Sequence, residues 1–294
     1  MRGAVRAVVV TGMAALAMLW SDPALAQTAA DPAIRYVALG DSRAAGPYLT
    51  PMSLTDGCAR SSEGYPAVVA RSLRPASFTN LACSGARTDN LTTTPQPTVT
   101  GPVPPQIDAL TSDTTLVTVS IGGNDIAWPR LVAPCYTRDP GSDARCRTDP
   151  ATASHMTAAL DELGPKVRAA LTEIARIAPN ARVLLVGHGG IFGARGCWPN
   201  IPASDADAAW IAGFFARMNR VLADAARGAG AEFVDVTAGA AGHDACAAPD
   251  QRWFEGLVSQ SLAQSLHPTT IGMRSMASRV VTAWQSPMGS TLPR

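Results

Sequence analysis

The chain has 294 residues, a formal net charge of +1 and 47% hydrophobic residues. This length and composition are those of a globular protein with one large domain or two small ones. The balanced charge leaves no basic footprint for nucleic acid, and aromatic residues at only 5% do not indicate a carbohydrate-stacking surface.

The first 26 residues are predicted to be a secretory signal peptide. Arg2 and Arg6 precede an apolar stretch, 7–20, and the small-x-small sequence Ala24-Leu25-Ala26 follows. The alternative is a membrane anchor, but the stretch is shorter than the roughly 20 residues that a span needs. We therefore expect cleavage after Ala26, secretion and no stable membrane insertion. The rest divides into a flexible segment over 27–34, one domain over 35–285 and a flexible tail over 286–294.

Short β-branched runs alternate with long helical patterns through the expected domain. The expected strands are Arg35–Leu39, Ser77–Leu81, Thr115–Ile121, Arg182–Gly187 and Glu232–Val236. Apolar residues at a 3.6-residue period predict helices over His155–Ile177, Asp205–Arg227 and from Pro268 onward. Gly164-Pro165 could kink or split the first of these helices. Strands that alternate with helices indicate a parallel sheet covered by helices on both faces.

Six cysteines lie in the part that would be exported: Cys58, Cys83, Cys135, Cys146, Cys197 and Cys246. In an oxidising compartment this even number predicts three disulfides. The sequence has no Cys-x-x-Cys spacing, so a zinc site is poorly supported. Of the roughly 15 pairings that six cysteines allow, we expect the sequential one, because each bond then closes one local excursion: Cys58–Cys83, Cys135–Cys146 and Cys197–Cys246.

Polar residues suited to acyl transfer follow the expected strands, where ligands bind to open parallel sheets. Ser42 follows the first strand, Gly85 the second, Asn124 the third and His188 the fourth, and His267 precedes the last helix. A serine, a glycine N–H, an asparagine amide and a histidine supply a nucleophile, oxyanion donors and a base.

Four motifs carry a family resemblance. "GDSRAAG", "SGARTDN", "GGND" and "HPTTIG", in this order between Tyr36 and Trp284, resemble the SGNH (GDSL) hydrolases, and the secreted, disulfide-bonded bacterial lipases and esterases above all. The resemblance implies a flavodoxin-like three-layer α/β/α sandwich with about five parallel strands. It also implies Ser42 as nucleophile and His267 as general base. Gly85, Asn124 and the backbone N–H of Ser42 would hold the oxyanion.

Each of these residues also has a structural interpretation. Ser42 could cap a helix, Gly85 could serve a turn, and Asn124 could be a buried amide. Asp41 and Asp125 are interpreted as structural residues that hold their loops. The four motifs together favour the catalytic interpretation.

The other histidines are assigned by elimination. We expect His155 at the surface and His243 in a structural site beside a disulfide. His188 is a candidate substrate contact, as are Arg43 and Phe192. Candidates for the pocket rim are the loop Thr88–Pro105 with Ile191, Phe192 and Trp198.

The third member of the triad departs from the family pattern. Many members carry Asp three residues before the histidine, where this chain has Gln264. A backbone carbonyl can only accept a hydrogen bond and therefore fixes the required imidazole tautomer. We expect the Gln264 carbonyl to orient Nδ1–H of His267.

Two other enzyme or binding classes are less well supported. Gly187, Gly189 and Gly193 weakly suggest a nucleotide binder, but their spacing is wrong, and Asp235 comes much later than the roughly 20 residues expected. The sequence lacks a Gly-x-Ser-x-Gly elbow, which disfavours the α/β-hydrolase family.

The sequence thus predicts a monomeric, secreted serine ester hydrolase for short-to-medium acyl esters, with no metal or organic cofactor. A polysaccharide O-acetyl esterase or a phospholipase is the alternative. A non-catalytic binding module is less favoured because the serine, glycine, asparagine and histidine are all retained.

Overall fold

The computed structural model describes Met1 and residues 33–287. Residues 2–26 of the predicted signal peptide, the segment 27–32 and the tail residues 288–294 lie outside the described residues. The described part contains the five expected strands at one sheet, each within a few residues of its predicted bounds: β1 (Arg35–Gly40), β4 (Ser77–Asn80), β7 (Leu116–Ser120), β8 (Arg182–Val186) and β9 (Glu232–Val234).

All neighbouring strands of this sheet are parallel, in the order β4-β1-β7-β8-β9. Counting only these strands along the chain, the order is 2-1-3-4-5, which is the flavodoxin-like arrangement. The order in which successive strands are added therefore reverses between β1 and β7, where Gly40 pairs with Ser120. Ligands of such sheets bind beyond the carboxyl ends of the strands at this switch point.

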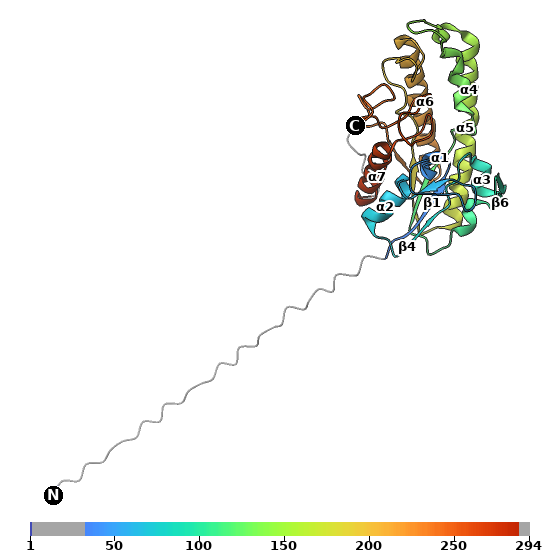
Figure 1. Cartoon of the computed structure of the whole chain (residues 1–294). Helices are drawn as coiled ribbons and strands as arrows, with labels where there is room; N and C mark the ends of the chain where they lie inside the picture. The colour runs from blue at the N-terminus through green and yellow to red at the C-terminus, as the bar shows by residue number, and fades with distance from the viewer. Residues whose placement is uncertain (2–32, 288–294) are drawn as a thin grey trace. The chain divides into compact units, whose positions relative to one another are not determined.

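Helices cover both faces of the sheet and enclose two hydrophobic cores (Figure 1). The helices α2 (Tyr65–Leu73) and α7 (Thr270–Gln285) pack together on one face. The long helices α5 (Pro150–Ile177) and α6 (Asp205–Gly228) pack together on the other. The predicted three-layer α/β/α sandwich is thus confirmed.

Two helices start at other residues than predicted. The helix α5 starts at Pro150, capped by Asp149, and continues through Pro165 without a break. Buried Leu160, Leu163 and Val167 hold it to the core on both sides of the proline, so packing offsets the lost backbone hydrogen bond. The last helix starts at Thr270 rather than Pro268, because Pro268 pairs with Phe254 in an isolated bridge and Thr269 caps Gly272 N–H.

Smaller elements make up the connections between the main strands and helices. Two antiparallel hairpins pair β2 (Met52–Ser53) with β3 (Arg60–Ser61) and β5 (Gln96–Thr98) with β6 (Gly101–Val103). The short helices are α1 (Ser42–Ala45), α3 (Thr88–Thr92), α4 (Trp128–Val132) and 3-10 turns at Gln106–Ala109, Ala133–Cys135 and Cys146–Thr148. Disulfides join Cys58 to Cys83, Cys135 to Cys146 and Cys197 to Cys246, which is the sequential pairing.

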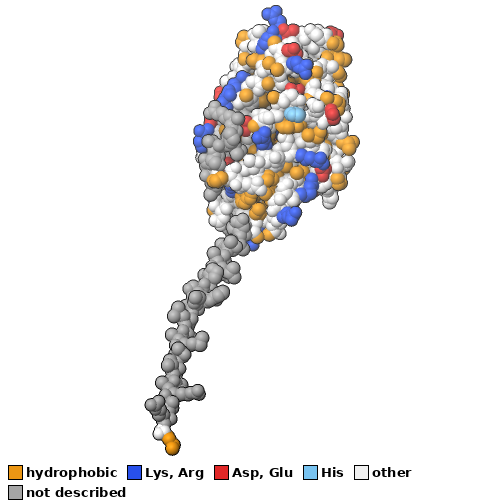
Figure 2. Space-filling view, turned by 90° about the vertical axis from the view of Figure 1, so that its left-hand side faces the viewer, with side chains coloured by type: hydrophobic (Ala, Val, Ile, Leu, Met, Phe, Trp, Pro, Cys, Tyr) orange, Lys and Arg blue, Asp and Glu red, His pale blue; other side chains and the backbone are white. Residues whose placement is uncertain are grey.

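The surface shows no concentration of one charge on the face in Figure 2, where basic side chains are spread among acidic and apolar ones. Within the described residues, each helix is either too short or too polar to cross a membrane.

Candidate active site

The first strand ends in a tight turn that presents Ser42. Gly40 has a φ of +139°, and a Cβ atom there would lie 2.4 Å from the Ser120 carbonyl oxygen, so only glycine fits. The side chain of Gln106 accepts from Gly40 N–H at 2.7 Å and donates to its carbonyl at 2.9 Å. Asp41 then caps α1 by accepting from Arg43 N–H at 2.9 Å. These bonds fix the backbone immediately before Ser42.

Ser42 and His267 are in direct contact. Nε2 of His267 lies 2.6 Å from Oγ of Ser42. Nδ1 of the same ring lies 2.7 Å from the Ser265 carbonyl oxygen, which can only accept and so places the proton on Nδ1. Nε2 is then left as the acceptor toward the Ser42 hydroxyl.

The expected role of the Gln264 carbonyl was wrong. It accepts from the backbone N–H of His267 at 3.1 Å, and the carbonyl hydrogen-bonded to Nδ1 is that of Ser265. Leu266 adopts a left-handed conformation, with φ +62°, and this turns the Ser265 carbonyl toward Nδ1. A main-chain carbonyl does orient the ring, but it belongs to Ser265, one residue after Gln264 in the chain.

Burial lowers the pKa of His267 to about 4. The Ser265 carbonyl opposes this shift because it favours a protonated ring, and the nearby Arg43 charge adds to it. The ring is therefore neutral at pH 7, which is the state that can accept a proton from a serine hydroxyl.

Three donors line the cavity beside Ser42. Ser42 and Gly85 have backbone N–H groups that meet no acceptor within the described chain. Asn124 uses one N–H of its amide to donate to the Ala86 carbonyl at 2.9 Å, which leaves the second free to donate. Gly85 has a φ of +89°, and a Cβ atom there would meet only the Gln96 amide nitrogen, at 3.7 Å. The arrangement can hold a developing negative charge on a substrate oxygen.

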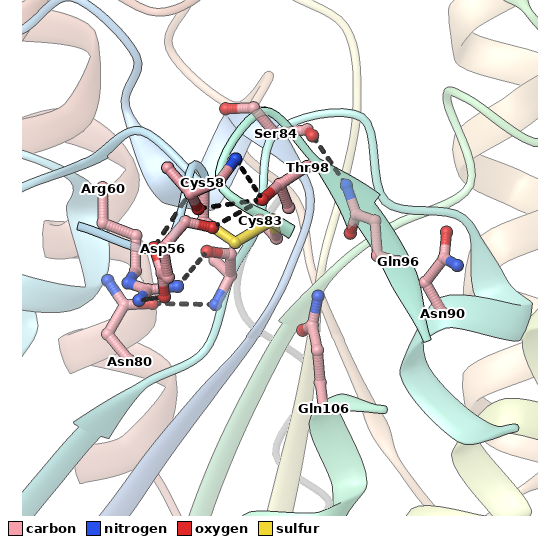
Figure 3. The surroundings of a disulfide bond; sticks show 12 residues. Asp56, Cys58, Arg60, Asn80, Cys83, Ser84, Asn90, Gln96, Thr98 and Gln106 are labelled. Atoms are coloured by element: carbon pink, nitrogen blue, oxygen red, sulfur yellow. Dashed lines mark hydrogen bonds and ion pairs between the residues drawn. A yellow bond between two sulfur atoms is a disulfide. The ribbon is translucent and has the colours of Figure 1, made fainter. Parts of the chain in front are cut away.

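The loop that carries Gly85 is held by the Cys58–Cys83 disulfide and its surroundings (Figure 3). Ser84 N–H donates to the Cys58 carbonyl at 3.1 Å, and the Gln96 side chain donates to the Ser84 carbonyl at 2.8 Å. Arg60 joins this support through an ion pair with Asp56 and a 3.2 Å bond to the Ala82 carbonyl.

The cavity at this edge has a volume of about 390 Å³. Trp128, Pro129, Ile191 and Phe215 form an apolar side, and Arg43 and His188 contribute polar groups as expected. Phe192 does not line it; the ring stacks on Phe215 at 5.8 Å and faces a neighbouring hollow. The expected rim was also wrong for Trp198 and for the Thr88–Pro105 loop, whose hairpin instead supports the Gly85 loop.

The comparison with known proteins decides the family. The family model described as the GDSL-like lipase/acylhydrolase family matches residues 38–274. This chain belongs to that family. Lipase 2 of Streptomyces coelicolor is 33% identical over 279 residues, which cover 92% of both chains. As a GDSL-like acylhydrolase, the protein is a carboxylic-ester hydrolase.

Two solved structures extend the similarity. An extracellular lipase from Streptomyces rimosus is 27% identical, with a TM-score of 0.68 and coverage of 86% of this chain and 100% of that one. Phospholipase A1 from Streptomyces albidoflavus is 25% identical, with the same TM-score and the same coverage.

The other residues discussed from the sequence of this acylhydrolase lie outside the reacting groups. Asp125 accepts from the Thr88 hydroxyl at 2.5 Å, which agrees with a structural role. His155 is exposed, and His243 bonds the Gln251 carbonyl at 2.7 Å while stacking on Trp253.

Sequence reasoning missed two buried glutamines that support the site. Gln106 fixes Gly40, and Gln96 fixes Ser84. Their only signal in the sequence is a long polar side chain in or directly after the Thr- and Pro-rich loop. That signal does not reveal a backbone partner 12 residues away for Gln96 or 66 residues away for Gln106.

Proposed function

We propose that this acylhydrolase is secreted and hydrolyses short-to-medium acyl esters through an acyl-enzyme on Ser42. The observation that carries the proposal is the contact of 2.6 Å between Oγ of Ser42 and Nε2 of His267, with Nδ1 held by a carbonyl. A neutral, oriented imidazole beside a hydroxyl is the arrangement that nucleophilic catalysis requires.

The reaction would take two steps. His267 Nε2 accepts the proton as Ser42 Oγ bonds to the ester carbonyl carbon, and the N–H groups of Ser42, Gly85 and Asn124 receive the oxyanion. When the intermediate collapses, His267 donates that proton to the leaving alcohol. Water then gives a proton to His267 and attacks the acyl carbonyl carbon; as the second intermediate collapses and releases the acid, His267 returns that proton to Oγ of Ser42.

The substrate class is supported by the cavity, and secretion by the disulfides. The apolar side made by Trp128, Pro129, Ile191 and Phe215 suits an acyl chain, and its limited volume favours short-to-medium lengths. Three disulfides are typical of proteins in an oxidising compartment. The similarity to a phospholipase A1 keeps phospholipids as a second candidate substrate.

The test is hydrolysis of p-nitrophenyl esters from acetate to palmitate by wild type, Ser42→Ala and His267→Ala. We expect activity with an optimum at short-to-medium chain length and a loss of at least about 10³-fold in both variants. If Ser42→Ala hydrolysed the esters at the rate of wild type, the serine mechanism would be excluded. If the enzyme hydrolysed only phosphatidylcholine vesicles, the proposed substrate class would be phospholipids rather than simple acyl esters.

A further inference from the structure

Two buried side chains of the Ser42 cavity have polar atoms without partners. Arg43 is 5% exposed, and its Nε and Nη2 atoms lack hydrogen bonds within the described residues. His188 is 1% exposed, and its Nε2 atom is likewise unpaired in this part of the chain. Buried polar groups nearly always have partners, so these two side chains of the cavity lining require a partner that the protein itself does not supply, either water or a bound ligand.

The guanidinium of Arg43 is a donor whose charge no hydrogen-bonded carboxylate neutralises within residues 33–287. Asp41 is next to it, but its carboxylate accepts the backbone N–H of Arg43 rather than the side chain. Burial raises the pKa of Asp41 to about 7 and lowers that of Arg43 to about 10, so the guanidinium keeps its charge at neutral pH. The Phe254 ring lies 5.3 Å from the guanidinium carbon and offers no acceptor atom.

His188 presents an acceptor. Asn219 holds its backbone through bonds of 2.8 and 2.7 Å, and the absent Cβ of Gly123 makes room for the ring. Burial, assisted by the charge of Arg43, lowers the pKa of His188 well below its usual range, although a hydrogen bond to the Ile121 backbone opposes this. A neutral ring that donates to a carbonyl has one remaining lone pair, and Nε2 is the unpaired nitrogen.

The chemistry of this pair selects its ligand. A hydroxyl can accept from Arg43 and donate to His188 at the same time. A phosphate diester or a carboxylate would satisfy Arg43 but leave the lone pair of His188 unpaired, and an ammonium group would be repelled by Arg43.

We propose that Arg43 and His188 form a hydroxyl-binding subsite beside Ser42. Resting on the proposed ester hydrolysis, it would favour esters whose alcohol part keeps a free hydroxyl near the scissile bond, such as partially acylated polyols. The two residues would then determine specificity for the leaving group.

The experiment compares two soluble esters with the same acyl group and the same three-carbon alcohol skeleton. The first, 1-butyrylglycerol, has two free hydroxyls, and propyl butyrate has none. We expect wild type to have a kcat/KM for the glycerol ester about 10- to 100-fold above that for the propyl ester, because a site built around a hydroxyl rejects the analogue that lacks it. A ratio near one in wild type would overturn the proposal.

Variants assign the preference to the two residues. Arg43→Met removes the donors, so the ratio should fall to within about threefold of one, whereas Arg43→Lys keeps a charged donor and should retain part of it. Arg130→Met is the matched control, because Arg130 is exposed and outside the cavity lining, and its ratio should equal that of wild type. A ratio in Arg43→Met equal to that of wild type would overturn the assignment.

A second pair covers the case in which Arg43→Met does not fold. His188→Gln keeps an acceptor oxygen and should retain more of the preference than His188→Leu; equal ratios in the two would also overturn the proposal. Failure of the underlying function is a separate result, since it would appear as hydrolysis of both esters by Ser42→Ala.

Discussion

The Nε2 atom of His267 lies 2.6 Å from the Oγ atom of Ser42, although the two residues are 225 positions apart in the chain. The position of the histidine depends on backbone bonds of its own loop. Glu255 N–H donates to the His267 carbonyl at 2.9 Å, and Leu266 N–H donates to the Gly256 carbonyl at 3.0 Å. The segment 255–257 thus sets where the imidazole stands.

This geometry predicts a small effect of the side chain at Gln264. We expect Gln264→Ala to keep kcat/KM on a p-nitrophenyl ester within about fivefold of wild type, because the amide makes no hydrogen bond in the described structure. His267→Ala, which removes the base, should lose at least about 10³-fold. A loss in Gln264→Ala that matches His267→Ala would instead assign the third role to the Gln264 side chain.

The polar atoms of Ser265 give a related prediction. Its hydroxyl donates to the Gly256 and Leu257 carbonyls at 3.0 and 2.8 Å, while its own carbonyl holds the imidazole. Ser265→Ala keeps the carbonyl but loosens the loop, so we expect a reduction of about 3- to 30-fold in kcat with a smaller change in KM. An unchanged kcat would show that the hydroxyl contributes nothing to the position of His267.

The pH profile of the reaction should extend to unusually acid pH. His267 acts only when neutral, so kcat/KM falls as the pH drops through its pKa, which burial lowers to about 4 from an ordinary value of about 6.5. We expect the acid limb near pH 4 in short assays, with samples returned to pH 7 to verify that the enzyme is intact. A limb near 6.5 in wild type would contradict the lowered pKa.

Arg43 tests the cause of that shift, because its charge also disfavours the imidazolium. The acid limb of Arg43→Met should move to higher pH, and that of Arg130→Met should not.

The lowered pKa of His267 also makes the stability of the fold depend on pH. Between about pH 6.5 and pH 4 the unfolded chain binds a proton at His267 that the folded chain does not. The free energy of unfolding therefore decreases as the pH is lowered through this window.

Gln106 is expected to matter although it is outside the reacting groups. Gln106→Leu leaves the buried N–H of Gly40 unpaired, while the Gly40 carbonyl keeps its bond from Cys83 N–H at 2.9 Å. We expect a loss of about 1–3 kcal/mol in the free energy of unfolding, measured by urea denaturation, and a lower kcat because Ser42 is two residues away. Gln251→Leu, at an exposed glutamine, should change neither quantity.

Much of this architecture could be predicted from the sequence because the relevant signals are local. Largely apolar runs marked four of the five strands; β4 is the exception, because Ser77–Asn80 is mainly polar and mostly exposed. The residues after the strands reached one sheet edge because parallel strands share their carboxyl ends. The contact between Ser42 and His267 followed from that rule and the family resemblance together.

The predictions that were wrong or missing concern features that depend on long-range geometry. The choice between the carbonyls of Gln264 and Ser265 turns on a left-handed Leu266, a conformation that a leucine gives no reason to expect. Phe192 was assigned to the cavity from its position after β8, but stacking on Phe215 of α6 turned it to the neighbouring hollow. The roles of Gln96 and Gln106 were equally hidden, because their partners are backbone atoms of other loops.

Replacing Gly85 or Gly123 of the site by alanine should lower kcat/KM, for a different reason in each case. Gly85 has room for a Cβ, with only the Gln96 amide nitrogen at 3.7 Å, but its φ of +89° costs an L-residue about 1–2 kcal/mol. Gly123 has no positive φ, yet its Cβ would lie 2.7 Å from Cε1 of His188 and displace that ring. In urea denaturation we expect Gly85→Ala to lose stability by that strain, and both variants to lose kcat/KM.

Gly213→Ala is the control of opposite sign, because this α6 glycine has open space around it and alanine should stabilise the helix by about 0.5–1 kcal/mol. A Gly123→Ala enzyme with wild-type kcat/KM would show that the position of His188 does not affect the reaction.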